Sequence, residues 1–258
     1  MINQNFEKAV QKSWRRCRKK GLPEYLKKPI IFLEEKDLQQ LLKDNSLLIS
    51  VFKESVGDIG THITEKSTFM LTDREGILVE VYGCSKILEE EFGIIKGVSL
   101  KEESYGTNAI SLFMDLKESV YLKPVDHYNH LLKRFYCYTL PLRYKDEIVG
   151  YLDVSTINKE MSKEMIAITK LLKTNITNTY IKEINLVKKE EKLKKMKLTN
   201  KQLTVLKLLS QGLTEVAVAN EMNLNVNTIK YHKKNIFEKF NVKSSCEAIT
   251  HALKFNIL

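Results

Sequence analysis

The chain has 258 residues and carries 42 Lys and Arg against 32 Asp and Glu, a formal net charge of +10. No apolar run approaches the ~20 residues that cross a bilayer, and the N-terminus lacks the apolar core of a signal peptide. We therefore expect a cytoplasmic protein with no membrane partner. The four cysteines form no C-x-x-C pair and the five histidines form no ligand-spaced pair, so neither a metal site, a disulfide framework nor a cofactor is expected.

The charge is unevenly distributed, because the two ends are basic and the middle is acidic. Residues 30–159 hold 15 basic and 21 acidic residues. An acidic middle favours a separate module that is kept away from phosphates over a chain that coats nucleic acid. The length suits two domains with connectors. We divide the chain into a basic leader (1–29), a central domain (30–159), a connecting helix with its linker (160–197) and a C-terminal domain (198–258).

The leader contains one amphipathic pattern. Ile2, Phe6, Val10 and Trp14 recur every four residues, which predicts a basic amphipathic helix that ends before Pro23. We expect this apolar stripe to pack on the central domain rather than on a membrane.

The central domain combines helices with short strands. Helical periodicity covers roughly Glu35–Val56 and returns after Lys159. Two antiparallel strand pairs are expected, Phe69–Leu71 with Ile77–Tyr82 and Tyr136–Leu142 with Ile148–Val154. Strands collected between helices predict an α+β fold, an antiparallel sheet with flanking helices that cover one of its faces.

A group of small and polar residues lies between the two strand pairs. Gly106 permits a close approach of backbone, and Thr107 and Asn108 supply short hydrogen-bonding side chains at a predicted helix start. These groups suit a pocket for a small polar ligand and a helix cap equally well. His127 suits a hydrogen bond to nearby backbone, and Cys137 lies on a predicted strand, where a thiol is buried and inert.

The order of these residues resembles a GAF sensor domain, most closely that of acetoin-regulator-type enhancer-binding activators. The segments that carry the resemblance are Tyr105–Ile110, Asp126–Tyr128, Cys137 and the leader residues Ser13, Trp14, Arg16 and Cys17. The resemblance implies a small-molecule effector, with Glu103, Tyr105, Gly106, Thr107, Asn108, His127 and Cys137 at the ligand. Asp126 stands where that family has Glu. The phosphate loop G-x-x-x-x-G-K-[ST] of the family's ATPase does not occur in this sequence.

Two other roles stay open for the central domain. One is a thiol-based redox sensor or a GAF-fold thiol enzyme that uses Cys84 or Cys137. The other is a purely structural dimerisation domain without a ligand. Thiol reactivity tests the first, and a binding screen separates the second from effector sensing.

The connecting segment carries a long apolar stripe. Its members recur every three or four residues and are Met165, Ile168, Leu172, Ile176 and Tyr180. The spacing predicts a helix over about 159–197 that packs on the sheet, forms a dimeric signalling helix, or does both.

The C-terminal domain is expected to contain four helices. Local signals mark their ends: the capping-box pair Thr199 and Gln202, the left-handed Gly212, the N-cap Thr214 and the turn residue Asn223. The third helix is expected to begin at Asn227 and Thr228, a polar pair able to cap a helix and meet a phosphate, and to run to about Phe240. A fourth covers roughly Ser245–Phe255.

The third helix has two chemically different faces. At 100° per residue, one side collects Ile229, Ile236 and Phe240, and the other collects Lys230, Tyr231 and Lys234. Core packing does not require cations on the second side. A helix that lies in the major groove of DNA does use cations and hydrogen-bonding groups there.

Residues 198–258 resemble the LuxR-type helix-turn-helix family. The segments that carry this resemblance are Leu198-Thr199, Leu206, Gly212, Ala219, Thr228–Lys230, Asn235-Ile236, Val242 and Ala248. It implies base and backbone contacts from Lys230, Tyr231 and Lys234, phosphate contacts from Asn227 and Thr228, and added charge from Lys233. It also implies that the last helix forms a dimer contact.

The two resemblances together predict a homodimeric DNA-binding transcription regulator that is controlled by a small effector, with activation favoured over repression. The expected partners are double-stranded promoter DNA, an effector of unknown identity and, for an activator, RNA polymerase. Enzymatic activity and catalytic residues are not expected.

Overall fold

The computed structural model describes residues 4–60, 62–63, 67–195, 197–255 and 257–258. The chain forms two compact units, Met1–Ile184 and Asn185–Leu258. Each unit has its own hydrophobic core. Among the described residues, no helix is both long enough and apolar enough to span a membrane.

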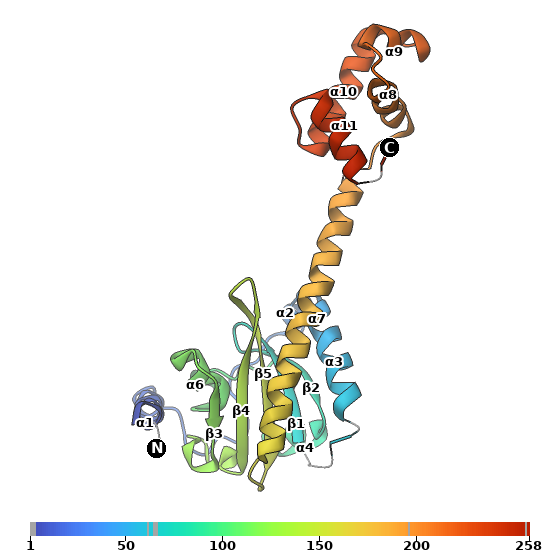
Figure 1. The fold of residues 1–258 in the computed structure, drawn as a ribbon. Helices are drawn as coiled ribbons and strands as arrows, with labels where there is room; N and C mark the ends of the chain where they lie inside the picture. The colour runs from blue at the N-terminus through green and yellow to red at the C-terminus, as the bar shows by residue number, and fades with distance from the viewer. Residues whose placement is uncertain (1–3, 61, 64–66, 196, 256) are drawn as a thin grey trace. The chain divides into compact units, whose positions relative to one another are not determined.

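The first unit is built on a five-stranded antiparallel sheet in the order β2-β1-β5-β4-β3 (Figure 1). Its strands are β1 Ser67–Asp73, β2 Leu78–Tyr82, β3 Val120–Leu122, β4 Phe135–Tyr144 and β5 Glu147–Ile157. Its helices are α1 Gln4–Lys19, α2 Glu35–Asp44, α3 Ser46–Gly60, α4 Ser85–Phe92, α5 Glu102–Tyr105, α6 Ala109–Leu116 and α7 Lys163–Lys195 as far as Ile184, and the 3-10 turns are η1 Pro124–Asp126 and η2 His130–Leu132.

Both predicted strand pairs are confirmed. The β1–β2 turn is held by Asp73, whose carboxylate Oδ1 accepts hydrogen bonds from the backbone N–H groups of Glu75 at 3.0 Å and Ile77 at 2.8 Å. Between β4 and β5, Lys145 and Asp146 adopt φ values of +49° and +65°, as a tight hairpin turn requires. The short edge strand β3 was not predicted, because three residues are too few to show an alternating pattern.

The expectation that helices cover only one face of the sheet is wrong. Successive strand residues point to opposite faces, and here both sets are apolar. Phe69, Leu152 and Val154 pack in one core with residues of α3 and α7. Met70 and Tyr151 pack on the other face with residues of α1, α4 and α6. An apolar sheet surface left in water would be unfavourable, so helices cover both sides.

The leader and connecting helices are confirmed with changes at their ends, and the helix expected before the sheet is divided in two. The leader forms α1, with Val10 buried and Phe6 and Trp14 packed against the same core, whereas Ile2 lies outside the described residues. The helix expected over 35–56 is two helices, because Asn45 closes α2 by donating its backbone N–H to Leu41 O. The connecting helix is α7.

The second unit contains four helices, as predicted: α8 Asn200–Ser210, α9 Glu215–Glu221, α10 Val226–Phe240 and α11 Ser245–Lys254. The capping box of Thr199 and Gln202 is present, and Gly212 has a φ of +87°. The predicted cap of α10 is wrong. Asn225 caps this helix instead, accepting the backbone N–H of Asn227 at 2.8 Å.

Two neighbouring residues of α7 test how this helix is held on the sheet. Leu172 is 0% exposed and Leu171 is 70% exposed. Leu172→Ala should lower the free energy of unfolding by about 2–5 kcal/mol, because it leaves a cavity against the sheet. Leu171→Ala should change it by less than about 0.5 kcal/mol. Urea unfolding followed by circular dichroism measures both, and equal effects would show that α7 does not dock as described.

Candidate effector cavity and nucleic-acid interface

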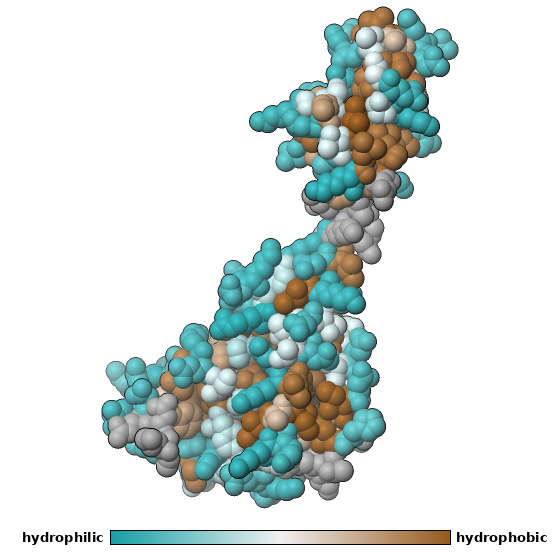
Figure 2. Space-filling view, in the orientation of Figure 1, coloured by the Kyte–Doolittle hydropathy of each residue, from teal (hydrophilic) through white to brown (hydrophobic). Residues whose placement is uncertain are grey.

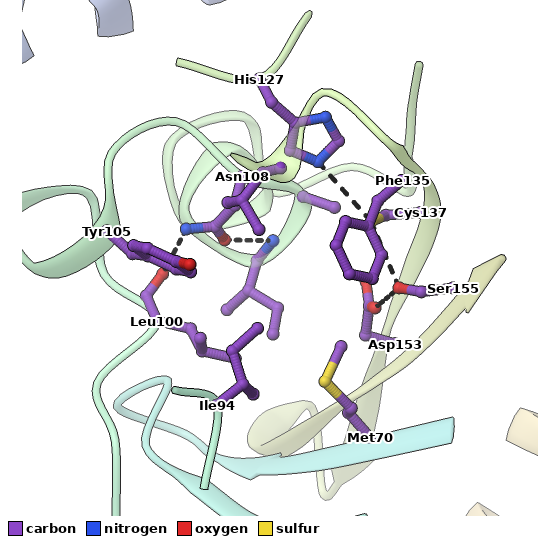
Figure 3. Close-up of a pocket in the computed structure, with 13 residues that line it drawn as sticks. Met70, Ile94, Leu100, Tyr105, Asn108, His127, Phe135, Cys137, Asp153 and Ser155 are labelled. Carbon is purple, nitrogen blue, oxygen red and sulfur yellow. Dashed lines mark hydrogen bonds between the residues drawn. The ribbon is translucent and has the colours of Figure 1, made fainter. Parts of the chain in front are cut away.

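A cavity of about 30 Å³ lies between the sheet and the segment that leads into α6 (Figure 3). Its apolar wall includes Met70, Ile94, Leu100, Leu132 and Phe135. Its polar wall is formed by His127, Cys137, Ser155 and Asp153, and Met70 lies beside Asp153 on the sheet. This volume corresponds to about two water molecules, so the cavity fits only a very small ligand.

The polar wall results from the register of β4 and β5. Cys137 lies opposite Ser155, and Thr139 lies opposite Asp153. The hydroxyls of Thr139 and Ser155 both donate to the Asp153 carboxylate, the second at 2.7 Å. Ser155 Oγ is also 3.2 Å from Cys137 Sγ, and that sulfur is 3.6 Å from His127 Nε2. Five polar side chains are therefore connected across two strands and a loop.

Burial controls the protonation of this wall. It raises the pKa of Asp153 to about 6, and the two hydroxyl donors offset it only in part. Burial lowers the pKa of His127 to about 4, against the effect of hydrogen bonds that the ring donates to backbone carbonyls. Burial also raises the pKa of the Cys137 thiol well above its ordinary value, and the nearby Asp153 carboxylate adds to this effect. At neutral pH the wall therefore holds a neutral imidazole, a protonated thiol and one carboxylate.

The protonated state of Cys137 disfavours a redox or thiol-enzyme role for this residue. Thiolate is the reactive form, and reactive cysteines are accessible and lie near cations. Cys137 is buried, with Asp153 and a neutral His127 around it. Cys84 is partly exposed at the start of α4 and does not line this cavity.

The structure brings together four of the seven residues expected at the ligand. Tyr105, Asn108, His127 and Cys137 line the cavity. Asn108 also caps α6. Its Oδ1 accepts the backbone N–H groups of Ile110 and Ser111, and its Nδ2 donates to the carbonyls of Leu100 and Gly106. All four of these hydrogen bonds of the Asn108 side chain are thus made with backbone groups.

The other three residues lie outside the cavity. Glu103 is exposed, because the short helix α5 turns it away and buries its neighbour Glu102 instead. Gly106 has a φ of +76°, and a Cβ there would lie 2.7 Å from Cδ1 of Tyr128. Thr107 is buried, and its hydroxyl bonds to Ser13 at 2.6 Å. Gly106 and Thr107 thus hold the segment before α6 against Tyr128 and against Ser13 of α1.

The leader helix α1 holds the segments that border the cavity. Ser13 bonds to Thr107, which precedes Asn108 in the chain. Trp14 Nε1 donates to the carbonyl of Asp126 at 3.0 Å, and its ring meets that of Tyr128 edge-on at 6.0 Å. Asp126 and Tyr128 flank His127, so α1 contacts the chain on both sides of a cavity residue.

Sequence reasoning missed Asp153 and Ser155 as members of the site. One signal was available: β5 alternates, and Asp153 falls on the same face as the buried Tyr151. A carboxylate at an inward position of a buried strand is uncommon and indicates a functional or structural partner. Its actual neighbours Thr139 and Met70 come from other strands, and only the register identifies them.

In the second unit, α10 presents the predicted face to solvent. Lys230, Tyr231 and Lys234 form what we call the exposed triad, in which Tyr231 is 62% exposed. Ile229, Ile236 and Phe240 are buried in the core on the other side. Within the described residues, the single ion pair of the triad joins Lys234 Nζ to Glu238 Oε1 at 3.9 Å, on the surface of the same helix. A surface pair of this kind is weak and leaves the cation available.

The remaining three predicted contacts have different surroundings. Asn227 is exposed and Thr228 is half-buried in the first turn of α10. Lys233 is half-buried. It forms an ion pair with Glu215 at the start of α9, and its Nζ lies 5.6 Å from the ring centre of Phe237. Lys233 therefore connects the two helices of the helix-turn-helix.

Comparison with known proteins identifies the second unit. Residues 196–252 match the family described as "Bacterial regulatory proteins, luxR family". Over 63 residues, 24% of this chain and 30% of the relative, the sequence is 36% identical to the Fimbriae Z protein of Salmonella typhimurium. The C-terminal unit is a LuxR-type helix-turn-helix DNA-binding domain, as the sequence predicted.

The first unit resembles a different group of proteins. It is 26% identical over 154 residues, 58% of this chain, to the acetoin dehydrogenase operon transcriptional activator AcoR of Bacillus subtilis. A signal-transduction and transcriptional-control protein of Clostridium beijerinckii is 23% identical over 155 residues. The chain covers 26% and 24% of these two relatives. The predicted resemblance to acetoin-regulator sensor domains is confirmed.

A solved structure supports the same fold assignment. The chain matches the E. coli DhaR(N)–DhaL complex with a TM-score of 0.63 and 15% identity, over 72% of this chain and 64% of the other. At this identity the match establishes the fold alone. The protein thus joins a sensor-type α+β unit to a LuxR-type DNA-binding unit.

The cost of the buried carboxylate can be measured. Because the pKa of Asp153 is about 6 in the fold and about 3.9 when unfolded, its burial costs stability as the pH rises from about 4 to about 6. Asp153→Asn should therefore be more stable than the parent protein at pH 7, by about 2 kcal/mol, and equal to it at pH 4. Urea unfolding at pH 4, 5, 6 and 7 measures this difference.

Asp58→Asn is the matched control, because Asp58 is exposed on α3. Its stability relative to the parent should not vary over the same pH range. His127 titrates in this range with the opposite sign, but it is present in all three proteins and cancels from the differences. A loss of stability in Asp153→Asn at pH 7 would contradict the account of a costly buried charge.

Proposed function

We propose that this protein is a transcription regulator that binds promoter DNA as a homodimer through α10 and is controlled by a small effector in the cavity of its first unit. The observation that carries the proposal is the exposed triad of Lys230, Tyr231 and Lys234 on the third helix of a LuxR-type domain. A helix with this outward face suits the major groove, where lysine contacts guanine edges and phosphates.

Activation and cellular location are part of the same proposal. The relative from Bacillus subtilis is named as a transcriptional activator, which supports activation and RNA polymerase as a further partner. A DNA-binding regulator acts where the chromosome is, so we place the protein in the cytoplasm. We assign it no enzymatic activity, since the family match and the relatives are those of regulators.

Effector control rests on the arrangement of the first unit. The cavity faces one side of β5, and α7 packs on the other side of the same strand. A ligand that moves β5 therefore acts on the helix that leads toward the DNA-binding domain. Such a ligand changes DNA binding only if it binds two arrangements of this helix with different affinity.

Dimerisation is supported by exposed apolar side chains. Leu253 on α11 is 58% exposed, and Leu171 on α7 is 70% exposed. Figure 2 shows apolar surface over the part of the first unit where α7 crosses the sheet. Because both helices have apolar residues available, we propose that α7 and α11 form the contacts between two copies of the chain.

The DNA-binding face is tested with duplexes selected from a random library by the parent protein. Lys230→Ala and Lys234→Ala should each lower the affinity for the selected duplex by about tenfold or more, since a lost base contact costs about 1–3 kcal/mol. Each variant should also reduce the slope of log affinity against log salt by about one. Gel shifts at several salt concentrations measure both quantities. Lys207→Ala, an exposed lysine on α8, is the matched control. An affinity unchanged in both triad variants would remove the basis of the proposal.

The dimer contact of α11 is tested with DNA that carries one or two half-sites. Leu253→Ala should reduce the preference for two half-sites by about tenfold or more, because burial of a leucine contributes about 1.5 kcal/mol or more. Val216→Ala, which alters an apolar residue of α9 that is 57% exposed, should leave that preference unchanged. An undiminished preference in Leu253→Ala would place the dimer contact elsewhere.

A further inference from the structure

Asp153 is the most unusual group in the first unit. Its side chain is 1% exposed, and its two oxygens accept hydrogen bonds from Thr139 and Ser155. Within the described part of the chain, no cation forms an ion pair with it. A carboxylate has about four lone-pair positions, and two hydroxyl donors leave the others unfilled. Buried charges are normally paired, so the open positions of Asp153 suit a ligand as its partner.

The surroundings of Asp153 determine which charge that partner has. The other titratable groups on the cavity wall are His127 and Cys137, which are neutral at neutral pH because burial disfavours their charged forms. Tyr105 is also neutral, since burial raises its pKa. The wall therefore carries one negative charge and no positive charge. It repels anions and attracts a cation.

The volume and the apolar wall of the cavity determine the size of the ligand and the chemistry of its uncharged part. The volume of about 30 Å³ excludes nucleotides and sugars. Ile94 and Leu100 lie across the cavity from Asp153 (Figure 3), and Met70, Leu132 and Phe135 complete the apolar wall. These side chains offer hydrogen bonds to no ligand. A short hydrocarbon fills this space better than a second polar group does.

We propose that the cavity binds a small primary ammonium compound, with its charged nitrogen against the Asp153 carboxylate and its short carbon chain among Ile94, Leu100 and Leu132. This assignment rests on the proposed effector function and names the chemical class of the effector. The ammonium donates a hydrogen bond to a free position of Asp153 and neutralises its charge. Charge-assisted bonds of this kind are stronger than those between neutral groups.

The proposal also explains why a destabilising residue occupies this position. An asparagine has nearly the same shape and also bonds to both hydroxyls, without the cost of burying a charge. A buried group that costs stability in the empty protein is typical of binding sites, because the ligand recovers that cost.

Trp14 provides a reporter for the test. It is the single tryptophan of the chain, and it contacts Asp126 and Tyr128 on either side of the cavity residue His127. We would titrate the full-length chain at constant ionic strength with ethylammonium chloride, ethanol and sodium acetate, which are similar in size and differ in charge. Trp14 fluorescence and thermal unfolding would be followed for each.

Ethylammonium should bind with a Kd in the millimolar range, as suits a ligand of about three non-hydrogen atoms. Ethanol and acetate should bind at least tenfold more weakly. Asp153→Asn should lower the affinity for ethylammonium at least tenfold while remaining folded, and Asp58→Asn should leave it unchanged. Equal or tighter binding of ethanol or acetate, no binding of ethylammonium, or full binding by Asp153→Asn would each overturn the ammonium assignment.

The effector role is tested separately. Gel shifts with the selected duplex, with and without saturating ethylammonium, measure whether the ligand alters DNA affinity. A change of threefold or more in the parent protein that is absent in Asp153→Asn supports the assignment and the effector role together. Specific binding without any change in DNA affinity would support the ammonium site and overturn the effector role.

Discussion

The pairing of β4 with β5 is the constraint on which the rest of the first unit depends. This register sets Thr139 beside Asp153 and Cys137 beside Ser155, and so it assembles the polar wall of the cavity. The two residues that flank Asp153 on β5 point to the other face of the sheet. Leu152 and Val154 pack beneath α7. One strand therefore forms the floor of the cavity on one face and the support of the connecting helix on the other.

Because β5 lines the cavity on one face and packs against α7 on the other, it gives a physical basis for the proposed effector control. Protein interiors are closely packed, so a ligand that displaces side chains on one face of a strand also strains the other face. The cavity is small, and a ligand larger than about two water molecules must move its walls. The loop that carries His127 is held by α1 through Trp14. The leader helix α1 contacts the loop that carries His127, and the connecting helix α7 contacts β5. Each of these helices is therefore separated from the cavity by a single element.

The DNA-binding unit uses its lysines in two different ways. Lys230 and Lys234 are exposed, whereas Lys233 forms an ion pair with Glu215 on the preceding helix. The ion pair joins α9 to α10, the two helices whose arrangement places a recognition helix in the groove. Neighbouring lysines are thus exposed for the proposed DNA contacts in one case and engaged in a contact between helices in the other.

The sequence alone determined most of the secondary structure and the class of both units. Hydrophobic periodicity, the capping box of Thr199 and Gln202 and the left-handed Gly212 are local signals, which act within a few residues and can be recognised without tertiary contacts. The two faces of α10 followed from helical geometry in the same way.

Only the tertiary structure decided which polar residues form the site. Asp153 lines the cavity although the sequence did not predict it, and Glu103 and Thr107 do not line it although they were predicted. These differences depend on the register of distant strands and on the packing of α1. The coverage of both sheet faces and the ion pair of Lys233 are likewise contacts between separate elements. Such contacts join residues that are far apart in the chain, and no local pattern specifies them.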